Sequence, residues 1–215
     1  MKKKSGKNSR FTLIELMVAL GVVLLLVSIG IMVAPLVTRH FSEAKTKALM
    51  GMIETAIEQY KNSNLSGGNY PVSPLTTKEK GTQYTPFFMD NYDLKNDSEN
   101  DNQNIKYNMV QFFEIEQVKS NLLYEPDAER HYITDGFGMP FLYMAPGYRM
   151  SGGYDLISLG ANKMPGDNEG KDVKKDDGAI YKRILNGRLS VEDKKEAKYA
   201  AQLGESDDIA NFKSK

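Results

Sequence analysis

The sequence predicts an α+β protein in which one long N-terminal helix packs part of its length on a small antiparallel sheet. Three features of the 215-residue chain predict this class. An uncharged, mostly apolar run occupies residues 16–37, and apolar residues then recur at helical spacing to about residue 62. Beyond the helix, short apolar runs alternate with turns rich in Gly, Pro and Asn, a pattern typical of short strands.

The N-terminal segment is predicted to cross a membrane. The 22 residues of the run 16–37 are enough, as a helix, to span a hydrocarbon core about 30 Å thick. Five basic side chains and no acidic one precede Phe11, so the positive-inside rule keeps the N-terminus in the cytoplasm and sends the rest of the chain across. A cleaved secretory signal is the alternative, although its apolar region is usually only about 7–15 residues long.

The helix is predicted to continue beyond the membrane, with residues 11–37 as its transmembrane part and residues 38–62 as its amphipathic part. In the second part an apolar stripe lies opposite charged side chains, so a folded domain must cover the stripe. Pro35 lies near the junction and either bends the helix or marks the end of its membrane part. Gly67 and Gly68 follow the expected C-terminus.

Residues 63–180 are predicted to form a globular head. Strands are expected within Phe137–Met144 and Tyr154–Leu159, and Tyr84–Met89 suits a strand or a packed loop. Met109–Leu123 fits a helix or strands equally well. Residues 181–215 are predicted to be a charged, solvated C-terminal extension, in which a capping sequence at Ser190 precedes a helix over Lys194–Leu203.

The composition excludes several kinds of active site. The chain has no Cys and only two His, so it offers no disulfide, no thiolate metal site and no cysteine nucleophile. It also lacks a phosphate-binding loop, a dinucleotide-binding glycine motif and a nucleophile elbow. We therefore expect no catalytic residue and predict that the protein is not an enzyme.

Glu15 lies near the start of the apolar helix, where a carboxylate is costly and needs a partner. The residues around it, FTLIELMVAL, resemble the N-terminal methylation motif of type IV pilins and type II secretion pseudopilins. The resemblance implies that residues 1–10 are a leader, that a prepilin peptidase cuts between Arg10 and Phe11, and that Phe11 is then N-methylated. It also implies that Glu15 serves assembly by neutralising the Phe11 ammonium of a neighbouring subunit.

One residue departs from this motif. Arg10 stands where the family usually has Gly immediately before the cut, and the nearest glycine is Gly6. A cut after Gly6 would leave basic residues on the mature helix and move Glu15 out of register. We therefore expect cleavage between Arg10 and Phe11.

Two segments of the head carry a second resemblance. DGFGMPFLY, Asp135–Tyr143, and YDLISLGANKMPGDNEGKDV, Tyr154–Val173, are similar to segments of the major pseudopilin. In that subfamily the second segment is a calcium-binding loop, so the resemblance implies calcium as a cofactor. The implied ligands are the carbonyl of Leu159 and the side chains of Asn162, Asp167 and Asp172.

The resemblance implies a structural subunit of the pseudopilus that drives protein export in type II secretion. The implied partners are further copies in a helical filament, minor pseudopilins, the inner-membrane secretion platform, prepilin peptidase and membrane lipid, with no nucleic acid. The subunit is expected in the inner membrane as a single-pass protein with a periplasmic head, and then in a periplasmic filament. Two alternatives stay open: a type IV pilin or minor pilin-like subunit of a surface or competence filament, and a membrane-tethered binding protein.

Overall fold

The computed structural model describes residues 12–64, 66–71, 83–87, 92–93, 106–107, 109–125, 130–176 and 178–212. The chain divides into two compact units, Met1–His40 and Phe41–Lys215. The predicted leader, its cleavage site and Phe11 lie outside the described residues.

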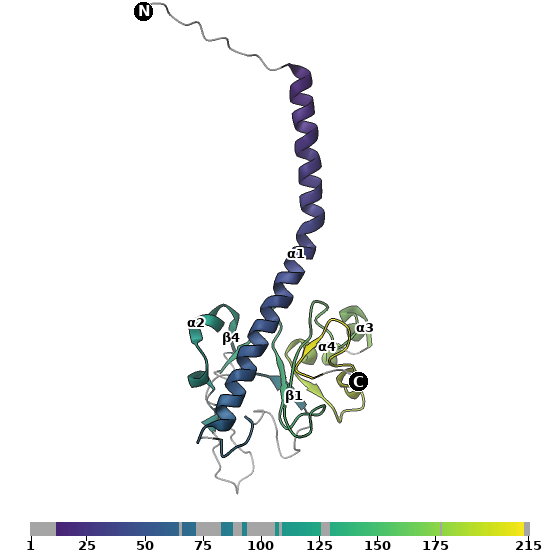
Figure 1. Ribbon diagram of the computed structural model, residues 1–215. Helices are drawn as coiled ribbons and strands as arrows, with labels where there is room; N and C mark the ends of the chain where they lie inside the picture. The colour runs from purple at the N-terminus through teal and green to yellow at the C-terminus, as the bar shows by residue number, and fades with distance from the viewer. Residues whose placement is uncertain are drawn as a thin grey trace, which may run out of the picture. The chain divides into compact units, whose positions relative to one another are not determined.

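Helix α1 runs from Leu13 to Asn62 and continues through Pro35 (Figure 1). All described side chains from residue 12 to residue 41 are exposed, and most of them are apolar. In the described part of the chain, α1 is the one helix that is long and apolar enough to cross a membrane, although a signal sequence passes the same test. The predicted long helix is confirmed.

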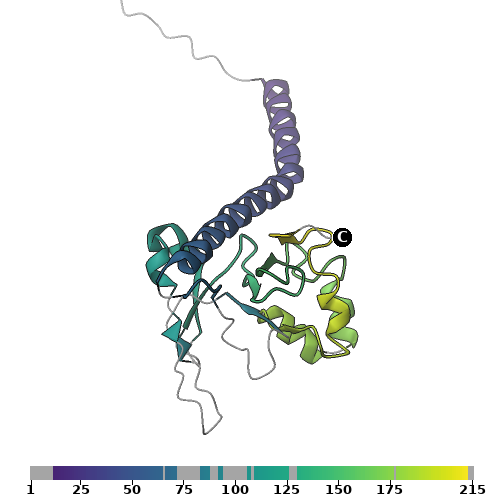
Figure 2. The same ribbon diagram turned by 60° about the horizontal axis from the view of Figure 1, so that its bottom comes forward.

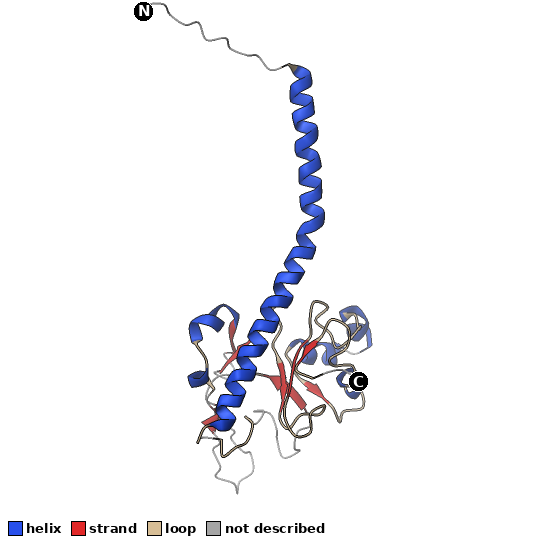
Figure 3. Ribbon diagram, in the orientation of Figure 1, coloured by secondary structure: helices blue, strands red, loops and turns tan. Residues whose placement is uncertain are grey.

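The head contains a five-stranded sheet whose strands lie in the order β8-β1-β6-β7-β9. Figure 3 shows the strands of the head in red. All four pairings are antiparallel, with Thr85 opposite Tyr143 and Leu142 opposite Ile157. The predicted small antiparallel sheet is therefore confirmed. Its strands are β1 (Gln83–Pro86), β6 (Leu142–Met144), β7 (Asp155–Ser158), β8 (Leu189–Ser190) and β9 (Ile209–Ala210).

Two smaller pairs of strands flank a group of short helices. Strand β2 (Tyr92–Asp93) pairs with β3 (Lys106–Tyr107), and β4 (Leu122–Glu125) pairs with β5 (Arg130–Ile133). For Met109–Leu123 the sequence favoured neither a helix nor strands. The structure forms short helices there, followed by strand β4. These helices are η1 (Val110–Phe112), α2 (Ile115–Val118) and η2 (Lys119–Asn121).

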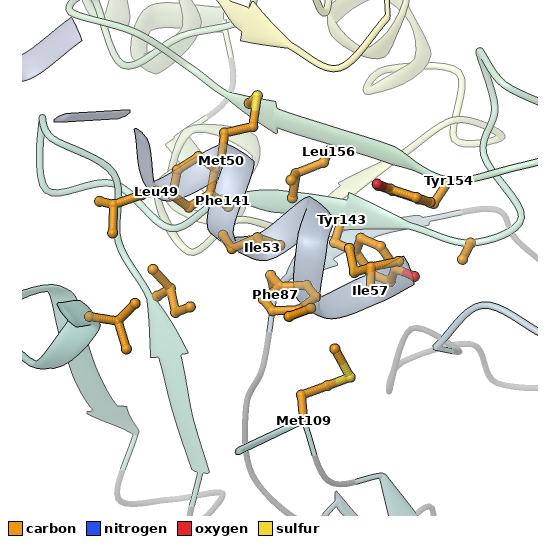
Figure 4. Close-up of a cluster of buried hydrophobic side chains, with 14 residues drawn as sticks. Leu49, Met50, Ile53, Ile57, Phe87, Met109, Phe141, Tyr143, Tyr154 and Leu156 are labelled. Atoms are coloured by element: carbon orange, nitrogen blue, oxygen red, sulfur yellow. The ribbon is translucent and has the colours of Figure 1, made fainter. Parts of the chain in front are cut away.

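The head half of α1 supplies one face of the main core. Its buried apolar residues recur at three- and four-residue steps, as an amphipathic helix requires, and they join a cluster that includes Phe87, Tyr143 and Leu156 (Figure 4). Burying one such large apolar side chain contributes about 1.5–3 kcal/mol relative to exposure. The residues of α1 in this cluster are Leu49, Met50, Ile53, Ala56 and Ile57.

A second core includes the C-terminal segment, residues 181–212. Helices α3 (Gly170–Asp176), α4 (Gly178–Leu185) and α5 (Ala197–Ala200) contribute to this core, and Tyr199 and Leu203 are buried in it. The prediction of a solvated appendage is therefore wrong. Its apolar residues are few and widely spaced, but short helices and strands β8 and β9 turn them inward while the charged side chains remain mostly outside.

Candidate assembly and metal sites

At the start of α1, Thr12 and Glu15 form reciprocal hydrogen bonds. The amide N–H and the hydroxyl of Thr12 both donate to Oε2 of Glu15, at 2.8 Å and 2.9 Å. The amide N–H of Glu15 donates in return to the Thr12 hydroxyl oxygen, at 3.3 Å. This reciprocal arrangement is a capping box, which satisfies amides that have no partner at a helix N-terminus.

The capping box gives the Glu15 carboxylate partners within its own chain. Both residues are exposed, so Glu15 is also accessible to a neighbouring molecule. The sequence singled out Glu15 but missed Thr12, although the spacing T-x-x-E is itself a signal of a capping box. The predicted contact with the Phe11 ammonium lies outside the described residues.

Three of the predicted calcium ligands, Leu159, Asn162 and Asp167, lie in the loop between β7 and α3, and the fourth, Asp172, lies in α3. The structure does not direct their side chains to one point. The amide group of Asn162 closes its own turn, because Nδ2 donates to the Gly166 carbonyl at 2.5 Å and Oδ1 accepts the Met164 amide N–H at 2.8 Å. The side chains of Asp167 and Asp172 are exposed, and Asp172 belongs to the first turn of α3. The side chain of Asn162 thus stabilises the turn of the loop.

Two aspartates of the C-terminal segment contact this loop instead. Oδ2 of Asp207 accepts the Asn162 amide N–H at 2.9 Å. Oδ2 of Asp208 accepts the amide N–H groups of Gly166 and Gly204, each at 3.0 Å. The C-terminal segment therefore fixes the loop through its backbone amides.

The backbone of the C-terminal segment approaches the loop closely at Gly160. Gly160 follows the buried Leu159 and has φ 63°. A Cβ atom at Gly160 would overlap the Asp207 carbonyl, so glycine is required there both by the backbone angle and by the neighbouring chain.

One oxygen of each carboxylate is buried without a hydrogen-bond partner, Oδ1 in Asp207 and Oδ1 in Asp208. Burial raises the pKa of Asp208 to about 8; the amides of Gly166 and Gly204 oppose this rise and the charge of Asp207 adds to it. A buried carboxylate oxygen requires a donor, a proton or a cation.

Calcium binds mixtures of carboxylate and carbonyl oxygens, so Asp207 and Asp208 fit it better than the exposed Asp167 and Asp172 do. Nowhere in the described ranges do three Asp, Glu, His or Cys side chains gather as a metal site. Backbone carbonyls of the loop would therefore have to complete the coordination. Sequence reasoning missed Asp207 and Asp208 because they follow the loop only after several further elements, and the one local signal is a pair of carboxylates directly before an apolar residue.

The other motif of the head joins the sheet to α1. Asp135 is 1% exposed, and its Oδ1 accepts the amide N–H groups of Phe137 and Met139, each at 2.8 Å. Its Oδ2 accepts the Ser158 hydroxyl at 2.6 Å. The next amide, that of Gly136, donates to the Thr46 hydroxyl on α1 at 2.9 Å. The Asp135 motif is thus a structural turn that holds the head half of α1 against the sheet.

Comparison with known proteins agrees with the sequence and the fold. Residues 89–176 match the family model described as Type II secretion system (T2SS), protein G, and the matched stretch includes both motifs of the head. No curated protein and no solved structure matched the chain. The match supports a pseudopilin role in type II secretion, and the apolar helix fits a membrane-anchored subunit. The matched stretch, the long apolar helix and the small antiparallel sheet together support a similarity of the chain to the pilin-like major pseudopilin of type II secretion.

Proposed function

We propose that the protein is a major-pseudopilin-like subunit that polymerises into the periplasmic pseudopilus of a type II secretion system and so drives protein export. The observation that carries the proposal is the fully exposed apolar half of α1, with Glu15 at its start, in a chain whose head matches protein G of type II secretion. Prepilin peptidase cuts between Arg10 and Phe11, and Phe11 is methylated. The subunit acts by assembly, without catalysis, together with minor pseudopilins and the inner-membrane secretion platform.

The exposed apolar surface of α1 suits two environments. In the inner membrane lipid covers it, and in the filament the same helices of neighbouring subunits do so. The exchange changes the partner but not the apolar character of the surroundings. A single subunit can therefore pass from a single-pass membrane protein with a periplasmic head to a filament.

The Glu15 carboxylate sets the axial position of one subunit relative to the next. Before assembly the Thr12 amide and hydroxyl stabilise it. In the filament it pairs with the Phe11 ammonium of a neighbour, because a charge buried without a partner costs several kcal/mol. The pair forms at only one axial offset between the two helices.

We also propose calcium as the ion that satisfies the buried oxygens of Asp207 and Asp208. Asp207 and Asp208, together with carbonyl oxygens of the loop, would hold the ion, and its positive charge would offset the negative charge of the two carboxylates. The residues themselves join the C-terminal segment to the loop through Asn162 and Gly166.

Two variants of Glu15 test the assembly proposal. Glu15→Ala removes both the charge and the capping box, whereas Glu15→Gln removes the charge and retains a side chain that can cap the helix. We expect both variants to insert into the membrane normally and to yield at least tenfold less filament in the fraction sheared from cells. Glu192→Gln, which neutralises an exposed carboxylate of the head, is the matched control. Normal filaments from Glu15→Gln would contradict the electrostatic role.

The N-terminus of the protein recovered from its own membrane tests processing. We expect mass spectrometry to find methylated Phe11. An intact Met1 would instead favour the membrane-tethered binding protein, and a start at Lys7 would contradict the assigned register.

A further inference from the structure

A half-open groove of about 370 Å³ lies in the head between α1 and the segment that contains α2. Two aromatic contacts fix its walls: the Phe112 ring meets Tyr60 edge-on with centroids 5.8 Å apart, and Phe113 contacts Phe87 at 6.2 Å. Gly51 leaves part of the groove open, since no atom lies within 4 Å of the position of a Cβ there. The groove is thus preformed, and both apolar and polar side chains line it.

The loop between β6 and β7, residues 147–153, carries two exposed large apolar side chains, and we call it the β6–β7 knob. Tyr148 is 51% exposed and Met150 is 40% exposed. Aromatic rings and methionine are favoured at protein interfaces because they bring a large contact area. Arg149 lies between them and donates from its guanidinium to the Ala201 carbonyl.

The knob is rigid although its tip faces outward. The fully buried Asp155 accepts the amide N–H of Arg149 at 2.7 Å and that of Met150 at 3.0 Å. The same carboxylate accepts the hydroxyl of the buried Tyr84 at 2.8 Å. A buried carboxylate is costly, and here it holds the backbone of an exposed loop in one conformation. Such preorganisation reduces the entropy lost on binding.

The knob and the groove lie on different sides of the head. The groove adjoins α2, whereas the knob contacts Ala201, directly after α5. Figures 1 and 2 show α2 on one side of the head half of α1, and α3 and α4 with the C-terminus on the other side. A contact between two different patches of one chain is heterologous, and repeated without closure it produces a filament.

We propose that Tyr148 and Met150 of one copy insert into the groove of the next copy, as the contact between neighbouring heads. The charges agree with this pairing, because Glu114 lines the groove and Arg149 lies in the knob. This inference rests on the proposed filament function and identifies the surfaces of the head that take part in it.

Disulfide trapping tests the contact directly, because the chain has no cysteine. Two full-length copies with different tags, one with Tyr148→Cys and the other with Gln117→Cys at the groove, are produced together in cells with the secretion system. We expect a mixed disulfide dimer in sheared filaments after mild oxidation, and at least tenfold less dimer from either variant alone. Tyr148→Cys with Lys182→Cys on α4 is the control pair. Absence of the mixed dimer from filaments would overturn the inference.

A variant that fills the groove provides the second test. Gly51→Leu places a side chain in open space, and leucine is a better helix former than glycine, so the thermal midpoint is expected to stay equal or rise. We expect at least tenfold less sheared filament from Gly51→Leu. Gly178→Leu on α4, where a Cβ also meets nothing within 4 Å, is expected to assemble normally. Normal assembly of Gly51→Leu would overturn the inference.

The two proposals fail in distinguishable ways. If the unmodified chain forms filaments but the mixed disulfide is absent, the knob and groove contact is wrong and the filament function stands. If the unmodified chain forms no filament, the filament function is wrong, and a mixed disulfide in the membrane would then still support the contact between two copies.

Discussion

At Gly136 only a hydrogen atom fits between the sheet and α1. A Cβ there would overlap the Ser42 carbonyl and lie 2.9 Å from the Thr46 hydroxyl oxygen. We predict that Gly136→Ala destabilises the head by about 1–3 kcal/mol, because the loop must move away from the helix. Unfolding in urea measures the change. Gly152→Ala, with open space around its Cβ, is expected to change stability by less than about 0.5 kcal/mol, and equal effects of the two variants would contradict the prediction.

Asp135 gives the head a dependence on pH. Burial raises its pKa above the ordinary value of 3.8, although Ser158 and two backbone amides oppose the rise. Because the folded state then binds the proton more tightly than the unfolded state, Asp135 contributes stability at low pH that is lost as pH rises through the folded-state pKa.

We therefore predict that Asp135→Asn reduces the fall in stability that occurs as the pH rises from below 3.8 towards neutrality. Asn retains an acceptor for the two backbone amides, so the turn is expected to persist. Thermal melts of both proteins across this range measure the effect. Parallel curves for the two proteins would contradict it.

Individual site residues were predictable where the chemistry is local. Glu15 stands out in an apolar helix, and its partner Thr12 lies three residues away. Asp207 and Asp208 were not predictable, because their partners Asn162 and Gly166 belong to a distant part of the chain and no periodic pattern links them. Asp172 fitted the resemblance but lies exposed on a short helix.

Among the elements, α1 was the most predictable and the edge strands the least. Fifty residues of helical pattern carry a strong signal, whereas β8 and β9 have two residues each, too few for a visible alternation. The strand expected within Phe137–Met144 is confined to Leu142–Met144, since the Asp135 turn uses the preceding residues.

The C-terminal segment completes the sheet at the β7 edge. Asn211 accepts the Leu156 amide N–H at 2.8 Å and donates to the Tyr154 carbonyl at 3.0 Å. We predict that a chain ending at Leu203 loses β9 and the loop contacts, so that limited proteolysis cleaves within residues 160–168. A chain ending at Phe212 is the control and is expected to resist cleavage like the full chain. Equal resistance of both truncations would contradict the role of the segment.

For the whole molecule, calcium is expected to act as a link between distant parts of the chain. A ligand present at 100 times its Kd stabilises the folded state by about 2.7 kcal/mol. We therefore predict that the Tm of the detergent-solubilised full chain is several degrees higher in calcium than in EDTA. Asp208→Asn is expected to abolish this response, and Asp172→Asn to retain it. No shift with calcium, or loss of the shift only in Asp172→Asn, would contradict the assignment.

The proposed removal of residues 1–10 would also change the charge of the chain. The full sequence has 28 basic and 28 acidic residues, and residues 1–10 contain five basic residues and no acidic one. The processed subunit would therefore carry a net negative charge, which favours solubility.

The contacts of Asp207 and Asp208 with the loop have a consequence for the order of folding. They join residues that are 45 and 42 positions apart in the chain, and β9 pairs with the distant β7. Closing so long a stretch of chain costs conformational entropy that only the completed contacts repay. A partly folded head therefore leaves this loop open until the C-terminal segment docks.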